Sequence, residues 1–475
     1  MKILFEKLYK ISFFLLLLSG HVHGQISFQK TYGGSDNDFG LSVQQTTDGG
    51  YILFGETASF GQGAWDFYLV KTNNIGDKLW EKTFGREKYD LGLSVKQTND
   101  GGYILCGAFS GLGSDSLALI KTDPDGNEIW SKQFRGSVVR DVGRFVQQTS
   151  DEGYIVVGFN GSSQEENVLL LKTDSDGNEE WMKTYERIGA QFGNGVRQTE
   201  DGGYIVAGQT KHRTLTGSDV YLMRMDAGGD TIWTKSFGTT SAQTSRSICI
   251  ADDGGFVVLG YDQSRMQDLY LLKTDLSGNE EWSKNYGGDG QDVGYAVQQT
   301  TDGGYILSGA KQNIGNQTSD MYAVKTSSSG EVEWENLYPK NEISDATSVQ
   351  QTTDGGYVLI GTTTRLTDTG SESDFYLVKT DPLGILAHGI DPKKGIIISA
   401  SPNPFTEFTI LKFENQNHEI YSMKLFDVQG RLVRKYEQIT SGEIRIEREN
   451  FIPGLYIFRL EKENKLVGTG KLIFD

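Results

Sequence analysis

The feature that most constrains the fold is a repeat of about 50 residues that occurs seven times along the chain. Each copy carries a turn of the form Asp-x-Gly followed by Tyr or Phe, and this aromatic residue recurs every 49 to 52 positions. A unit of this length cannot bury its hydrophobic faces until neighbouring units stack on it. The seven turns begin at Asp48, Asp100, Asp151, Asp201, Asp253, Asp302 and Asp354.

Each repeat predicts four short strands. In the sixth copy the strand-like runs are 292–300, 305–309, 320–326 and 332–338, and turns rich in Gly separate them. Four strands at a period near 50 are typical of a propeller blade. The sequence therefore predicts an all-β fold, with a seven-bladed β-propeller over residues 25–390.

The chain ends favour a closed ring over an open solenoid. The seventh copy has His388 where the earlier copies have Trp, so its fourth strand is missing. Near the N-terminus, the segment 28–34 matches 282–288, with Phe28 in the place of the Trp. Pairing of this segment with the last repeat explains both defects and leaves fewer exposed sheet edges. The Trp residues in question are Trp80, Trp130, Trp181, Trp233, Trp282 and Trp334.

The repeated polar residues are interpreted as structural. Gly supplies positive φ in the turns and Asp accepts hydrogen bonds from nearby backbone amides. The sequence 123–127, Asp-Pro-Asp-Gly-Asn, invites a calcium interpretation, but the equivalent turns 73–76 and 327–330 keep the Gly and lose the carboxylates. We therefore predict plain turns, no metal and no cofactor.

No catalytic constellation is predicted. Beyond residue 24 the chain has three histidines, His212, His388 and His418, and they do not form a metal set within the propeller. Cys106 and Cys249 belong to repeats that do not touch in a seven-membered ring, so two buried thiols are expected.

Carboxylates recur at one position of the repeat, which favours a structural role because a catalytic residue is needed only once. Their abundance leaves open a glycosidase pair, which only a separation in space would reveal. The residues at this position are Asp38, Asp90, Asp141 and Asp292, replaced elsewhere by Gln191, Gln243 and Ser344.

The N-terminus has the layout of a signal peptide over residues 1–24: Lys2, Lys7 and Lys10 precede the apolar run 11–18. The run is too short to be a membrane span, and no second one follows. The chain carries a net charge of −18, and all of the excess lies in residues 25–394. An acidic surface repels phosphate backbones, so no nucleic-acid partner is expected.

A change of pattern follows the seventh repeat. After the linker 391–395, residues 396–475 contain alternating strands bounded by Gly430, Gly442 and Gly454, which predict a small antiparallel sandwich. This tail resembles the C-terminal sorting domain of proteins exported by the type IX (Por) secretion system of certain Gram-negative bacteria. The resemblance rests on the motifs at 401–405, 425–433, 453–456 and 470–473, and its marker residues are Pro402, Asn403, Pro404, Gly430, Gly454, Tyr456 and Lys471.

The resemblance implies translocation across the outer membrane, with the type IX machinery as a partner and with attachment to the cell surface or release. For the propeller, two hypotheses remain: a binding or adhesion module for an extracellular glycan or protein, and a polysaccharide-degrading enzyme or an accessory to one. The loops between the second and third strands vary in length and chemistry, and variable loops on a scaffold favour binding. The predicted ligand anchors are Trp65, His212, Arg213, Arg265 and Arg365.

Overall fold

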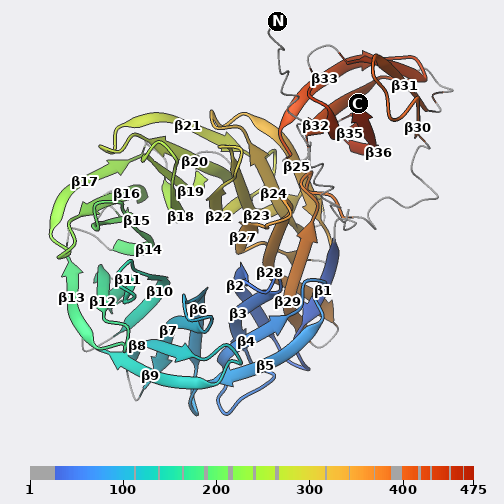
Figure 1. The fold of residues 1–475 in the computed structure, drawn as a ribbon. Coiled ribbons are helices and arrows are strands. Elements are labelled where there is room, and N and C mark those ends of the chain that lie inside the picture. Colours follow the sequence, from blue (N-terminus) through green and yellow to red (C-terminus); the bar gives the residue numbers. More distant parts are fainter. Residues whose placement is uncertain are drawn as a thin grey trace, which may run out of the picture.

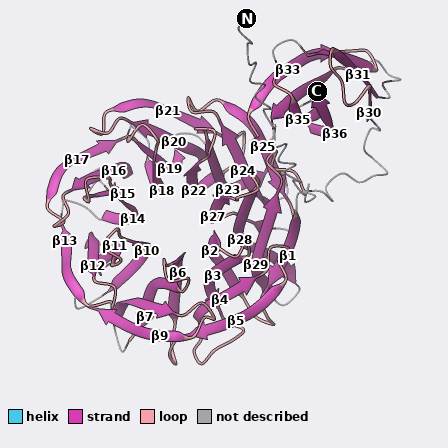
Figure 2. Cartoon of the chain, in the orientation of Figure 1, coloured by secondary structure: helices cyan, strands magenta, loops and turns pink. Residues whose placement is uncertain are grey.

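The computed structural model describes residues 27–474 except 112–113, 137–139, 163–164, 187–190, 212–217, 239–241, 263–266, 316–317, 342, 368–369, 387–397, 414, 416–418, 428–429, 449–450 and 464. Every helix or strand assigned within these residues is a β-strand (Figure 2). No described segment forms a helix able to cross a membrane. The predicted signal peptide and linker lie outside the described residues.

Five consecutive repeats each form a separate four-stranded antiparallel sheet, in which the strands pair in chain order. The sheets lie side by side around a ring, with the first strands innermost and the fourth strands outermost (Figure 1). The strands are β2 (Asp38–Gln45), β3 (Tyr51–Thr57), β4 (Asp66–Thr72) and β5 (Lys78–Phe84); β6 (Asp90–Gln97), β7 (Tyr103–Ser110), β8 (Asp115–Thr122) and β9 (Glu128–Phe134); β10 (Asp141–Gln148), β11 (Tyr154–Ser162), β12 (Glu165–Thr173) and β13 (Glu179–Tyr185); β14 (Gln191–Gln198), β15 (Tyr204–Lys211), β16 (Ser218–Met225) and β17 (Thr231–Phe237); and β18 (Gln243–Ile250), β19 (Phe256–Asp262), β20 (Asp268–Thr274) and β21 (Glu280–Tyr286).

The last two repeats are joined into one nine-stranded sheet, which differs from the separate sheets expected. The short strand β26 bridges them: its residues Ser344 and Ile343 pair with Thr363 and Thr364 of β28. Ile343 of β26 also pairs with Ser319 of the preceding repeat. The strands are β22 (Asp292–Gln299), β23 (Tyr305–Asn313), β24 (Thr318–Thr326), β25 (Val332–Tyr338), β26 (Ile343–Ser344), β27 (Ser348–Gln351), β28 (Tyr357–Thr367) and β29 (Gly370–Thr380), with β1 (Phe28–Tyr32).

Strand β1 lies beside the last repeat, although the two are far apart in sequence. It pairs antiparallel with β29 over five residue pairs, from Phe28 against Lys379 to Tyr32 against Phe375. The hydroxyl of Tyr32 donates to the carbonyl of Gly76 in the first repeat at 2.6 Å. β1 thus occupies the fourth-strand place that the seventh repeat lacks.

An aromatic residue on each fourth strand packs against the next repeat. The Trp80 ring lies 6.0 Å from the ring of Tyr103 and against Gly126, where a Cβ atom would lie 2.6 Å from the indole. Phe28 makes the same contacts with Tyr51, at 6.0 Å, and with Gly76. Such ring pairs stabilise by about 1 kcal/mol beyond the area they bury.

The Asp-x-Gly turns have a buried partner that the sequence analysis did not identify. The carboxylate of Asp48 accepts from the Gly50 amide at 2.9 Å and pairs with Lys71 at 2.8 Å. The Lys71 side chain is 5% exposed and also donates to the Thr72 carbonyl. The basic residues at this position are Lys71, Lys121, Lys172, Arg224, Lys273, Lys325 and Lys379.

The C-terminal residues form two further antiparallel sheets around one core, β30-β31-β34 and β33-β32-β35-β36. Tyr421, Leu425, Phe458 and Phe474 are among the buried residues of this core. The strands are β30 (Ile398–Ser401), β31 (Phe408–Phe413), β32 (Tyr421–Asp427), β33 (Leu432–Ile439), β34 (Glu443–Glu447), β35 (Gly454–Lys462) and β36 (Lys465–Phe474).

The C-terminal domain packs on the sixth and seventh repeats, beside β25 (Figure 1). Phe426 and Ile457 join a core cluster that includes Trp334 and Leu383. Leu383 is fully buried, whereas Asp125, at the equivalent turn of the second repeat, is exposed. The domain therefore caps the last turn of the repeats.

Candidate functional site

Two of the five predicted ligand anchors are described, and they lie in different repeats, the first and the seventh. Trp65 is half-buried: its ring stacks on Phe39 at 5.0 Å and contacts Tyr89 at 5.6 Å. Arg365 is exposed on the β28–β29 hairpin and pairs with Glu372. His212, Arg213 and Arg265 lie outside the described residues, as do His388 and His418.

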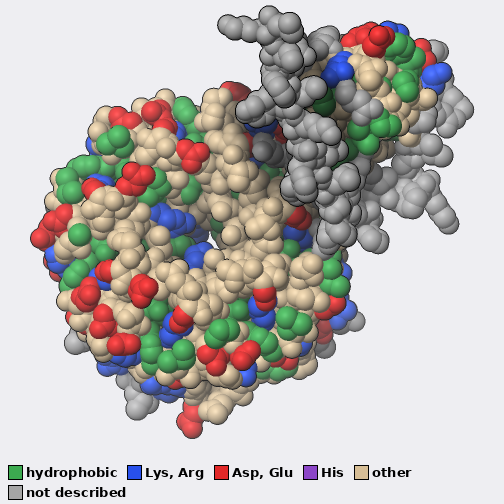
Figure 3. Space-filling view, in the orientation of Figure 1, with side chains coloured by type: hydrophobic (Ala, Val, Ile, Leu, Met, Phe, Trp, Pro, Cys, Tyr) green, Lys and Arg blue, Asp and Glu red, His purple; other side chains and the backbone are tan. Residues whose placement is uncertain are grey.

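The centre of the ring holds a cationic cavity, and it is the strongest candidate site in the described part of the chain. Figure 3 shows this centre hollowed, with Lys and Arg side chains gathered in it. Two adjoining volumes, about 390 Å³ and about 180 Å³, share seven lining residues. Each is the fourth residue of the first-strand segment of one repeat: Leu41, Leu93, Arg144, Asn194, Arg246, Tyr295 and Thr347.

The larger volume forms the mouth of this channel. It is also lined by Leu91, Arg140, Val142 and Phe159, which lie where first strands begin and second strands end. The variable loops and the connections between repeats join the strands on this face. The mouth thus opens on the face that carries these loops.

Arg144 and Arg246 line the mouth. Arg144 donates to the Asn194 side-chain oxygen, and its guanidinium carbon lies 4.9 Å from the Phe159 ring centre. Burial and neighbouring Arg246 lower the pKa of Arg144 to about 10, although Glu166 opposes this. Arg246 is exposed, 5.6 Å from the Tyr261 ring centre. Neither Arg144 nor Arg246 forms an ion pair with a carboxylate of the described residues.

The smaller volume lies deeper and contains a second pair of cations. Lys96 Nζ and Arg197 Cζ lie 5.3 Å and 4.3 Å from the centre of one ring, that of Phe145. Burial, with a contribution from Arg197, lowers the pKa of Lys96 to about 8. The channel is therefore strongly positive inside a protein whose net charge is −18.

The channel wall is not uniform. Repeats three to six contribute the polar residues Arg144, Asn194, Arg246 and Tyr295, whereas the first two repeats contribute Leu41, Leu91 and Leu93. One side of the mouth thus offers hydrogen-bond donors and positive charge, and the opposite side offers an apolar surface.

The sequence analysis missed this site because it looked for function in the loops. The available signal was a departure from the repeat: Lys96 and Arg197 stand where most copies have Gln. Arg144, Asn194 and Arg246 stand where other copies have Leu, Tyr or Thr. Single cations on the innermost strand of a repeat point into the axis once the ring is formed.

The recurring carboxylates accept hydrogen bonds from backbone amides. Asp90 accepts from the amides of Arg86 at 2.6 Å and Ser110 at 3.0 Å, and Asp38 accepts from Gly34 at 2.8 Å. Within the described residues, no three His, Cys, Asp or Glu side chains gather as a metal site. Cys106 and Cys249 are free and buried in different core clusters, as expected.

The marker residues of the tail have structural places in the C-terminal domain. The Asn403 side-chain oxygen accepts from the Ile473 amide at 2.8 Å, and exposed Pro402 and Pro404 flank it. Gly430 adopts φ +82° against Pro382 of the last repeat.

The remaining marker residues lie on β35 and β36. Tyr456 donates to the Ile452 carbonyl at 2.9 Å, Gly454 begins β35, and Lys471 pairs with Ile457 through the backbone.

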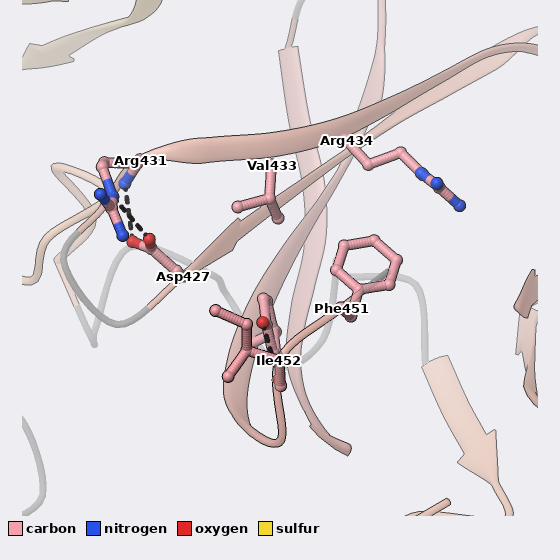
Figure 4. A pocket seen from close by; sticks show the side chains of 7 residues that line it. Asp427, Arg431, Val433, Arg434, Phe451 and Ile452 are labelled. Atoms are coloured by element: carbon pink, nitrogen blue, oxygen red, sulfur yellow. Dashed lines mark hydrogen bonds and ion pairs between the residues drawn. The ribbon is translucent and has the colours of Figure 1, made fainter. Parts of the chain in front are cut away.

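A surface pocket of about 300 Å³ lies in this domain (Figure 4). Asp427 and Arg431 form an ion pair at 2.7 Å at one end of it, and Arg434 lies 4.8 Å from the Phe451 ring centre at the other. Ile452, between them, is 75% exposed.

Comparison with known proteins identifies the C-terminal domain and supports the fold of the repeats. Residues 399–475 match the family model described as a secretion system C-terminal sorting domain. A search of curated proteins finds no match to the chain. Among solved structures, a polysaccharide lyase of family PL25, an ulvan lyase, is similar with a TM-score of 0.50 and 11% identity, covering 74% of this chain and 96% of that one.

Two further structures are more weakly similar. Chaetomium thermophilum Sqt1 has a TM-score of 0.42 and 10% identity, covering 71% of this chain and 96% of that one. A puromycin hydrolase has a TM-score of 0.46 and 13% identity, and the match covers 80% of this chain and 60% of that one. At 11% identity, the similarity to the ulvan lyase shows a propeller-like fold alone. The chain thus carries repeated propeller-like sheets followed by a type IX (Por) secretion sorting domain, and it is a protein exported to the cell surface or the medium.

Proposed function

We propose that the repeats form a seven-bladed β-propeller closed by β1, and that this propeller binds an anionic extracellular glycan at the mouth of its central channel. Bonds between the first and last repeats support the closure. The Gln45 amide donates to the Gln350 side chain at 2.7 Å, as the Gln97 amide donates to Gln44 at 2.8 Å between neighbouring repeats.

The observation that carries the binding proposal is the positive charge of Arg144 and Arg246, which form no ion pair with a carboxylate of the described residues, whereas Arg140 beside them pairs with Asp115. Arg144 is half-buried, and a cation held partly out of water without an ion-pair partner is costly and frequently functional. Arg144 and Arg246 present guanidinium groups whose geometry matches carboxylate and sulfate groups. An anionic ligand would supply the missing negative charge.

The apolar side of the mouth favours a sugar as the carrier of that charge. Leu41, Leu91 and Leu93 form a surface on which the C–H face of a sugar ring can pack. Ligand sites of this kind combine an apolar wall with a few polar groups that fix orientation. The loop residues Trp65, His212, Arg213, Arg265 and Arg365 remain predicted outer contacts, and alanine at these positions should weaken binding.

A binding array of neutral, carboxylated and sulfated oligosaccharides, run beside an activity screen on the same sugars, tests this function. We expect retention of the acidic sugars, with affinity that falls as salt is raised, and no cleavage. Cleavage of a retained sugar would establish the polysaccharide-degrading alternative. Binding of proteins but of no acidic sugar would overturn the glycan assignment.

A further inference from the structure

A second feature of the channel goes beyond glycan binding at the mouth: two positions that carry a Gln joining neighbouring repeats elsewhere carry cations at the inner level. In four repeats, the seventh residue of the first-strand segment is a Gln whose side-chain oxygen accepts an amide of the next repeat. These bonds join Gln44 to the Gln97 amide (2.8 Å), Gln147 to Gln198 (3.2 Å), Gln298 to Gln351 (2.6 Å) and Gln350 to Gln45 (2.7 Å).

Lys96 and Arg197 occupy this position in the second and fourth repeats. Neither side chain has an acceptor atom. The amides at the equivalent places, those of Gln148 and Ile250, are thus left without the glutamine acceptor that their counterparts have. The two substitutions remove two acceptors and add two positive charges at one level of the channel.

No negative charge of the described residues compensates for these cations. Both lie over the Phe145 ring, and the titratable neighbour of Arg197 is Cys249, whose thiol pKa is raised to about 11 by burial. The thiol is therefore neutral at pH 7. Ser94 and Ser247 also line this level, and each accepts a backbone amide while keeping a hydroxyl proton to donate.

We propose that the inner level is a binding site for a small oxyanion, a carboxylate, sulfate or phosphate group, held by Lys96 and Arg197. Two cations and the hydroxyls of Ser94 and Ser247 line this volume and form a donor set that an acceptor-rich group satisfies. The oxyanion is either free in solution or carried by the ligand at the mouth, and the chemistry of recognition is the same.

The repeat itself provides the test variants. Lys96→Gln and Arg197→Gln restore the residue found in four other copies, so the double variant should fold and gain bonds between repeats. We expect its melting temperature, in buffer without oxyanions, to exceed that of the natural protein. We expect the natural protein to show a saturable rise in melting temperature with millimolar sodium sulfate, and the double variant to show at least about a tenfold weaker sulfate affinity.

Several controls separate this site from others. Sodium chloride at equal ionic strength separates specific binding from general salt effects. Arg144→Gln/Arg246→Gln removes two cations that line both volumes but leaves Lys96 and Arg197 in place, so this variant should keep a saturable sulfate response. The response of the natural protein should weaken above pH 8, because Lys96 loses its proton near there. An equal saturable response in the natural protein and the inner double variant would overturn the proposal.

Competition identifies the source of the oxyanion. If an acidic oligosaccharide displaces sulfate, the group is carried by the ligand; if sulfate and sugar bind together, the inner site holds a free anion. Sulfate binding at the inner level without any glycan binding would refute the proposed function and leave this inference standing.

Discussion

The amide of Gln45 donates to the side-chain oxygen of Gln350, 2.7 Å away and 305 positions along the chain. In the other direction, the Thr353 amide donates to the Gln45 side chain at 2.9 Å. The Thr47 amide donates to Gln97 at 2.9 Å in the same way between the first and second repeats. Gln45 thus links the first repeat to the last as neighbouring repeats are linked.

Removal of β1 should therefore destabilise the whole ring. Deletion of residues 25–34 removes the five pairs with β29, the Tyr32 bond to Gly76 and the Phe28 packing on Tyr51. We expect a sharply lower melting temperature, and for Phe28→Ala alone a loss of about 2–3 kcal/mol in the free energy of unfolding. Gln29→Ala, on the exposed side of the same strand, should change little. A melting temperature unaffected by the deletion would contradict the closed ring.

The buried basic residue of the turns should contribute most to the free energy of unfolding where the carboxylates that pair with it are also buried. Lys325 is 0% exposed and pairs with Asp302 and Glu333, whose side chains are 3% and 15% exposed. Lys325→Met leaves two carboxylates in a protein interior, and urea unfolding should show a loss of about 3–5 kcal/mol. Lys71→Met is the matched control, because Asp48 is 59% exposed and can be hydrated. Equal losses in both variants would refute this explanation.

Glu56 should make stability depend on pH. Burial raises its pKa to about 7, even though a hydrogen bond from Tyr89 opposes the shift. Because the folded state holds the proton more tightly than the unfolded state, this contribution is complete below about pH 4.5 and is lost as pH rises through 7. Glu56→Gln should thus gain up to about 3 kcal/mol over the natural protein between pH 4.5 and pH 8. Parallel stability curves across this range would contradict the assignment.

Removal of residues 396–475 should have two separate effects. Export to the surface should stop, because the sorting domain is absent, and the protein should collect in the periplasm. The propeller should still fold, but exposure of Leu383 and Ile385 should reduce its free energy of unfolding by about 2–4 kcal/mol. Cell fractionation and urea unfolding measure the two effects. Ile452→Ser, at an exposed position of the same domain, should change neither, and unchanged stability after truncation would show that the domain does not cap the seventh repeat.

Much of the fold was predictable because the same sequence features recur in each repeat. Four strands per unit, the turn chemistry and the match of Phe28 to the Trp positions all appear as recurring patterns. The bridge made by β26 was not predictable, since it is a single parallel pair between neighbouring repeats, Ser319 with Ile343. The Lys71–Asp48 ion pair was not predictable either, because a Lys in a strand is expected to face solvent unless a carboxylate partner is known.

The candidate site was hidden for a different reason. Arg144 and Arg246 are separated by about two repeats in sequence, and only the ring brings their side chains to one axis. In the sequence, Lys96 and Arg197 are polar residues of an alternating strand. Only the hydrogen bonds made by Gln at the same position of other repeats show that these two residues replace a Gln that joins neighbouring repeats. Sequence reasoning followed variability in the loops, while the informative variation lay on the innermost strands.

The central claim is that the channel mouth binds an acidic glycan, and an isothermal titration of the secreted protein with an acidic oligosaccharide from the array tests it most directly. Arg144→Gln/Arg246→Gln should weaken the affinity at least about 100-fold, since each lost charged hydrogen bond costs about 1.5–3 kcal/mol. Lys183→Gln/Lys284→Gln removes the same charge from the outer strands, where each Lys pairs with a carboxylate, and should leave the affinity within about twofold. Equal affinities for the natural protein and the mouth variant would contradict the claim.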